Sequence, residues 1–255
     1  MNRRAVLAAV VAVACAVAAL AGSSAVFAAG TPAVGSTGVT GSTSSTGTTG
    51  TTSATGPTGA TAPAPLVYRT LHYGERGPLV RLLQQELAAK HYVIGKLGVY
   101  DARTGRAVLA FRKMTGMERN HIASPAVFRK LAAGEGAFKV RYPGQGRHVE
   151  GDLTHQVLAL IGANGKVQRL YPMSSGKPST PTQLGTYQVY MQEYGTNNDG
   201  MVNSSFFNGG DAIHGYAEVP PYAASHGCLR VPIPDSLSIR NWVRIGTTVD
   251  VYYRR

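Results

Sequence analysis

The sequence predicts a two-domain protein, in which a small three-helix bundle precedes a mainly β domain of the sandwich or barrel type. The length of 255 residues allows one or two domains. Apolar residues recur at helical spacing up to about residue 140, and strand-like segments with glycine and proline turns follow. A hydrophobic fraction of 44% is enough for an ordinary core and excludes a fully disordered chain. Two cysteines exclude a disulfide-dense scaffold and a four-cysteine zinc site.

Residues 1–29 are predicted to be a secretory signal peptide. Arg3 and Arg4 precede an uninterrupted apolar run from Ala5 to Ala21, and small residues continue to Ala29. This is the layout of an export signal with cleavage near residue 28 or 29. The alternative is an uncleaved membrane anchor, for which the run is short. We therefore expect a secreted or cell-wall protein that meets the membrane only through this segment.

Residues 30–65 are predicted to be a disordered tether. They consist almost wholly of Thr, Gly, Ser, Ala and Pro, and contain neither a charge nor an aromatic side chain. Such a segment buries too little apolar surface to offset its conformational entropy. It would let a globular part work at a distance from the membrane.

Residues 66–140 are predicted to form the three helices. The first opens at Gly77-Pro78 and places Val80, Leu83 and Leu87 on one face. The second runs from Asp101 to Met114, with Ala107, Phe111 and Met114 at similar spacing. The third begins with Ser124 as N-cap and Pro125 at N1, and ends at Gly134. Its predicted buried face consists of Val127, Phe128 and Leu131.

Residues 141–255 are predicted to be mainly strands. Segments 157–161 and 166–171 flank Asn164-Gly165 and predict a hairpin with a primed turn. Residues 186–191 alternate as a further strand, and residues 249–252 form a closing strand. One helix is expected from Asp235 to about Val243, with Asp235 as its cap.

Cys228 is the candidate nucleophile. If the signal is removed, Cys15 leaves with it unless that cysteine carries a lipid, and Cys228 is the one thiol of the exported chain. In the oxidising compartment of an exported protein, a lone cysteine is a buried hydrophobic residue, an intermolecular disulfide link or a nucleophile. His214 and His226 stand close in sequence as candidate bases, which a thiol needs for attack. The amides of Gly227 and Cys228 are candidate oxyanion donors.

Two stretches resemble known families. The helical region contains Leu71-His72-Tyr73-Gly74-Glu75-Arg76-Gly77 and His91-Tyr92, which is similar to the peptidoglycan-binding module of many cell-wall enzymes. His214-Gly215, followed by Ser225-His226-Gly227-Cys228-Leu229-Arg230, resembles the signature of the L,D-transpeptidase (YkuD-type) catalytic domain. Ser174-Ser175-Gly176 and Thr180 to Tyr187 resemble further motifs of that domain.

The second resemblance implies the chemistry. Cys228 would attack the amide between the third and fourth residues of a peptidoglycan tetrapeptide stem, with His214 as the base. The Gly215 carbonyl would orient His214, and His226 would support the cysteine loop. The expected oxyanion or substrate-binding residues are Gly227, Ser225 and Arg230. A second stem would resolve the thioester as a 3→3 cross-link, with no metal or organic cofactor.

Two other functions remain open: an L,D-carboxypeptidase that trims tetrapeptide stems, and a wall-binding protein without catalysis. The net charge of +12 suggests a polyanionic partner. Residues 66–140 hold 13 basic and 5 acidic side chains and so carry most of the excess. With export expected and no nucleic-acid motif present, we expect peptidoglycan and anionic wall polymers as partners rather than nucleic acid.

Overall fold

The computed structural model describes residues 67–254. The predicted signal peptide and tether lie outside these residues. The helices and the strands described below belong to one compact unit of the chain. Among the described residues, no helix is both long and apolar enough to cross a bilayer.

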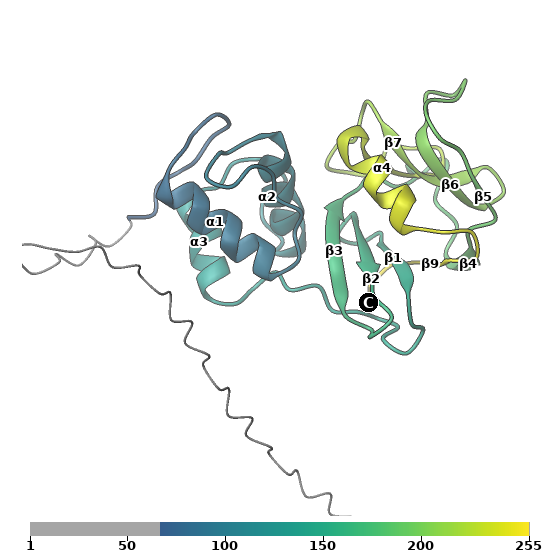
Figure 1. Cartoon of the computed structure of the whole chain (residues 1–255), viewed down its shortest axis with the longest axis horizontal. Coiled ribbons are helices and arrows are strands. Elements are labelled where there is room, and N and C mark those ends of the chain that lie inside the picture. The colour runs from purple at the N-terminus through teal and green to yellow at the C-terminus, as the bar shows by residue number, and fades with distance from the viewer. Residues whose placement is uncertain (1–66, 255) are drawn as a thin grey trace, which may run out of the picture. The chain divides into compact units, whose positions relative to one another are not determined.

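Three short helices come first, as the sequence predicts (Figure 1). Helix α1 spans Pro78–Ala89, α2 spans Ala102–Met114 and α3 spans Pro125–Ala132. Proline at the first position starts α1 and α3, where its missing N–H costs nothing. The Asp101 side chain caps α2 by accepting the N–H of Thr104. Ser124 occupies the cap position of α3, but its side chain makes no capping bond.

Within residues 67–254, nine strands and one helix follow, arranged as a sandwich of two sheets. The five-stranded sheet has the order β3-β2-β1-β9-β4, and the four-stranded sheet has the order β5-β6-β7-β8. The strands of the first sheet are β1 His148–Asp152, β2 Val157–Ile161, β3 Val167–Pro172, β4 Gly185–Gln188 and β9 Thr248–Tyr252. Those of the second are β5 Met191–Gln192, β6 Val202–Asn208, β7 Asp211–Tyr216 and β8 Leu229–Pro232. Helix α4, Ile233–Trp242, packs against β6, β7 and β8.

Strand β2 explains how helices and sheets join. All five of its residues are buried. Successive side chains of a strand point to opposite faces, so both faces of β2 must be covered. Val157, Ala159 and Ile161 join the hydrophobic cluster of the three helices. Leu158 and Leu160 join the second cluster, which lies between the two sheets. The helices therefore cover the β2–β3 part of one face of the five-stranded sheet, and the four-stranded sheet packs on the other face.

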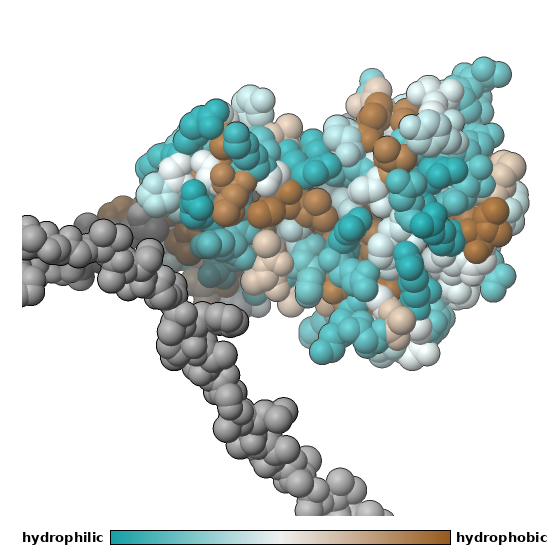
Figure 2. Space-filling model, in the orientation of Figure 1, coloured by the Kyte–Doolittle hydropathy of each residue, from teal (hydrophilic) through white to brown (hydrophobic). Residues whose placement is uncertain are grey.

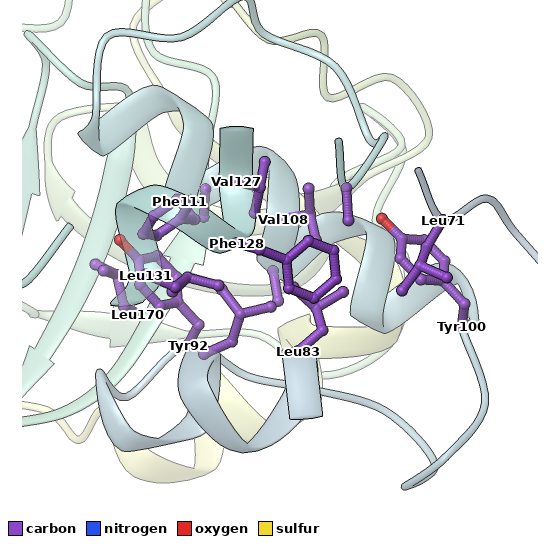
Figure 3. Close-up of a cluster of buried hydrophobic side chains, with 14 of the residues drawn as sticks. Leu71, Leu83, Tyr92, Tyr100, Val108, Phe111, Val127, Phe128, Leu131 and Leu170 are labelled. Atoms are coloured by element: carbon purple, nitrogen blue, oxygen red, sulfur yellow. The ribbon is translucent and has the colours of Figure 1, made fainter. Parts of the chain in front are cut away.

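The helical cluster is continuous with this sheet. Figure 3 shows Leu170 of β3 among side chains of the helical region, including Tyr92 and Phe111. The predicted buried faces of all three helices belong to this cluster, with Met114 only partly buried against it. On the face seen in Figure 2, hydrophilic residues cover most of the described surface and hydrophobic ones form small groups.

Three local predictions were wrong. The β2–β3 hairpin has no primed turn: Asn164 keeps a negative φ, and only Gly165 is left-handed, at φ 70°. Gly162 and Ala163 lengthen the loop, so the Gly165 N–H closes a turn on the Gly162 carbonyl. The strand expected at 186–191 is divided between β4 and β5, because the chain crosses from one sheet to the other.

The predicted cap of α4 is the third error. The helix begins two residues before Asp235, after Pro232. The Asp235 carboxylate does not cap it and is only 2% exposed. It pairs instead with Arg103 and Arg106 of α2, at 2.9 and 3.1 Å. Burial beside two guanidinium groups from a distant helix outweighed the local capping preference.

Candidate active site

Two parallel strands bring Cys228 and His214 to one place. Strands β7 and β8 pair with Ile213 opposite Leu229 and His214 opposite Arg230. Cys228 directly precedes β8, so the same register sets it opposite Ala212. The Ala212 N–H does donate to the Cys228 Sγ, at 3.4 Å. His214 lies two residues further along β7, and residues two apart in a strand share a face.

The Cys228 thiol is partly buried at the edge of a cleft. Besides Ala212, its neighbours are the Gly210 carbonyl oxygen at 3.7 Å and the Met201 Sδ at 4.0 Å. Burial raises the pKa of the thiol, and the nearby Asp211 carboxylate raises it further. The Ala212 N–H and Arg230 act in the opposite direction. The net shift is upward, so the resting thiol is protonated at neutral pH.

His214 is held as a neutral base. Its ring is 2% exposed, and its Nδ1 lies 2.9 Å from the Gly215 carbonyl oxygen. A carbonyl only accepts, so Nδ1 carries the proton and Nε2 has a free lone pair. Burial lowers the pKa of the imidazole, the Gly215 bond opposes this, and Arg230 lowers the pKa further.

The thiol and imidazole line one cleft of about 320 Å³. No hydrogen bond joins them directly in the described part of the chain. The cleft is also lined by Asp199, Met201, Gly210, Tyr216, Ser225, His226 and Arg230. Asp199 and Met201 come from the loop between β5 and β6.

Ser225 and Gly227 build the cysteine loop. The buried Ser225 Oγ donates to the Cys228 carbonyl at 2.6 Å and accepts the Gly227 N–H at 3.2 Å. The Thr182 hydroxyl donates to the Gly227 carbonyl at 2.6 Å. Gly227 has a φ of 135°, and a Cβ there would lie 2.1 Å from an Asp211 oxygen. This position therefore requires glycine.

The remaining predicted residues differ in burial. The His226 side chain is exposed, with its Nε2 3.1 Å from the Lys177 Nζ. The Arg230 guanidinium lies over the Tyr216 ring, 4.1 Å from its centroid. Its Nε is buried and has no hydrogen-bond partner among the described residues. Within residues 67–254, Arg230 thus brings a positive charge into the cleft and forms no salt bridge there.

Sequence reasoning missed several residues that shape the site. Asp211 raises the pKa of the thiol, and the Tyr216 ring lies under the Arg230 guanidinium. Lys113 of helix α2 bonds the backbone of residues that precede the site. The buried Lys113 Nζ donates to the carbonyls of Gln156 and Met173, at 3.0 and 2.8 Å. The Gln156 side chain in turn bonds the Ser175 N–H and hydroxyl. Asp211 and Tyr216 had a local signal, since they stand three residues before and two residues after His214.

The described residues offer no preformed metal site. No group of three or more His, Cys, Asp or Glu side chains within residues 67–254 could hold an ion.

Comparisons with known proteins find a matching family model and similar solved structures. The family model for the L,D-transpeptidase catalytic domain (YkuD) matches residues 146–251. A solved structure of an L,D-transpeptidase from Xylanimonas cellulosilytica DSM 15894 is 33% identical, with a TM-score of 0.65, and the match covers 74% of this chain and 100% of that one.

Two other solved L,D-transpeptidases are more distant. The one from Stackebrandtia nassauensis is 23% identical, with a TM-score of 0.46, over 74% of this chain and 98% of that one. The one from Mycobacterium smegmatis is 20% identical, with a TM-score of 0.37, and the match covers 42% of this chain and 58% of that one. No curated protein matches the chain.

Proposed function

Because this chain belongs to the L,D-transpeptidase family, we propose that it is an exported cysteine L,D-transpeptidase that forms 3→3 cross-links. The family acts on peptidoglycan stem peptides. The observation that carries the proposal is the cleft shared by Cys228 and His214, in which the Gly215 carbonyl holds the imidazole proton on Nδ1.

In the acylation step, the Cys228 Sγ attacks the carbonyl carbon of the third stem residue. Its proton passes to the Nε2 of His214, since both groups are neutral at rest. The bond to the fourth residue, D-alanine, then breaks, and His214 returns the proton to the departing amine. The product is a thioester on Cys228.

In the transfer step, the side-chain amine of a second stem attacks the thioester carbonyl. His214 removes a proton from that amine and delivers one to the departing Cys228 sulfur. An amide bond forms, the carbon–sulfur bond breaks, and the free thiol is restored. Water in place of the amine would release a tripeptide.

The oxyanion of both steps needs donors next to the sulfur. The Gly227 N–H is already bonded to the Ser225 hydroxyl, so we assign the main share to the Cys228 N–H. Arg230 would bind a substrate carboxylate through the part of its guanidinium that faces the cleft. His226 would support the loop from its exposed side through Lys177.

The rest of the chain is assigned by the same proposal. Residues 1–29 direct export, residues 30–65 tether the protein, and residues 66–140 bind peptidoglycan. The excess of basic side chains in residues 66–140 favours attraction to anionic wall polymers. Residues 141–255 carry out catalysis.

Incubation of purified protein with disaccharide-tetrapeptide muropeptides tests the proposal. Mass spectrometry should find a tripeptide acyl group on Cys228 and a 3→3 dimer in the products. C228A should keep wall binding and yield neither species. Tripeptide without dimer would indicate a carboxypeptidase. Absence of an acyl-enzyme, with wall binding intact, would indicate a wall-binding protein without catalysis.

A further inference from the structure

Three cavities follow one another from the catalytic cleft to the helices. Tyr216 lines both the cleft and a second cavity of about 350 Å³, which we call the junction cavity. Arg106 and His121 line the junction cavity and also a third, of about 600 Å³, which we call the helix-face cavity. Each cavity therefore shares wall residues with the next.

Both parts of the chain build the junction cavity. The helical region contributes Arg106, Leu109 and His121, and the end of β7 with the segment after it contributes Tyr216, Ala217 and Val219. Hydrogen bonds fix these walls to each other. Arg119 donates to the Pro221 carbonyl at 2.9 Å, and Arg103 donates to the Pro234 carbonyl at 2.9 Å.

The junction carries an excess positive charge. Arg103 and Arg106 share the single carboxylate of Asp235, which leaves one guanidinium charge in excess. Asp101 lines the helix-face cavity, and its carboxylate accepts the backbone N–H groups of Lys96 and Thr104, which hold it in place but do not remove its negative charge. The excess positive charge therefore acts at Arg106 on the junction cavity, where a ligand that carries a carboxylate fits.

The chemistry of the cleft selects the ligand. His214 protonates the departing amine and deprotonates the incoming one, so both amines occupy its side of the thioester. Tyr216 lies on that side, since its ring meets the His214 ring edge-on at 5.6 Å between centroids. The departing group is a single D-alanine, which is too small to need two further cavities. The incoming group is a whole stem peptide with free carboxylates.

We propose that the junction and helix-face cavities bind the stem peptide of the acyl acceptor. The helical region then forms part of the acceptor site in addition to attaching the enzyme to the wall. This inference rests on the proposed transpeptidase function, and it makes the transfer step, rather than acylation, depend on the junction.

A217W tests the inference. Ala217 is exposed and lines the junction cavity but not the catalytic cleft, so an indole there fills the cavity without touching the thiol or the imidazole. E218W is the matched control, since Glu218 is the exposed next residue and does not line the cavity. H121W narrows the same passage from the helix side and serves as a second variant if A217W does not fold.

Three rates are measured for each variant: acyl-enzyme formation from a tetrapeptide donor, transfer to a stem-peptide acceptor, and transfer to free D-alanine. In A217W, the KM for the stem acceptor should rise at least about tenfold, a loss of about 1.4 kcal/mol in binding. Acylation and transfer to D-alanine should match wild type, and E218W should match wild type throughout.

Unchanged stem transfer in folded A217W and H121W overturns the inference. Slower acylation in A217W would place the donor there and also overturns it. If wild-type protein forms no acyl-enzyme, the proposed function fails instead. Calorimetric titration of the same stem peptide then decides the inference, since equal affinity for wild type and A217W overturns it and weaker binding to A217W supports it.

Discussion

Replacing Lys113 with methionine should remove a rise in stability between pH 7 and pH 9. Lys113 is 2% exposed, and within residues 67–254 its ammonium group meets two backbone carbonyls but no carboxylate. Burial lowers the pKa of Lys113 from its ordinary 10.5 to about 7, and the positive charge of Arg119 contributes. The unfolded chain keeps the ordinary value.

The sign follows from the two pKa values. Below pH 7, the lysine is protonated in both states, and the folded state bears the full cost of a buried charge. Above pH 7, the folded lysine is neutral while the unfolded lysine stays protonated until pH 10.5, so the free energy of unfolding rises with pH. At 1.36 kcal/mol per pKa unit, the gain from pH 7 to pH 9 is about 2 kcal/mol.

Urea unfolding of wild type and K113M at pH 6, 7, 8 and 9 measures this gain. The methionine leaves the Met173 carbonyl without a hydrogen-bond partner, whereas the Gln156 carbonyl keeps the Met173 N–H at 3.0 Å. The loss of about 1–3 kcal/mol for the one unsatisfied group is the same at every pH. The test therefore compares the slopes of the free energy of unfolding against pH, not its absolute values. K139M, which removes an exposed lysine, should keep the wild-type slope. Parallel pH profiles of the free energy of unfolding for wild type and K113M would show that Lys113 is not the source of the rise.

Three further predictions concern the active site. G227A should lower the free energy of unfolding by about 1–3 kcal/mol in urea titrations and slow acylation, because a Cβ there meets Asp211 at a backbone φ suited to glycine; wild-type stability would contradict this. D211N should move the pH midpoint of iodoacetamide alkylation of Cys228 downward, because the carboxylate raises the pKa of the thiol; an unchanged midpoint would count against it. The acid limb of kcat/KM should lie below pH 6.5, since burial lowers the pKa of His214 and activity is lost as that imidazole becomes protonated; a limb above pH 6.5 would exclude this assignment.

Local sequence signals predicted the elements whose causes are local. Pro78 and Pro125 start helices and Asp101 caps one, because these effects involve only a few neighbouring residues. Successive side chains of β2 enter two different hydrophobic clusters, one on each face of the sheet. The complete burial of this strand therefore depends on the three-dimensional packing. Asp235 shows most clearly where local signals fail. Its carboxylate pairs with two arginines of the distant helix α2 instead of capping its own helix, α4.

The sequence alone identifies the chemical groups of the candidate site: a thiol, two histidines, an arginine and the glycines between them. Their protonation states and their arrangement come from the folded structure. Parallel pairing of β7 and β8 brings Cys228 and His214 to one cleft, and the segments between them contain nothing that predicts that register. Burial leaves both groups neutral, and packing brings Asp211 close to the thiol and Tyr216 into the cleft. These effects depend on which surfaces lose contact with water, and that is settled only when distant parts of the chain pack together.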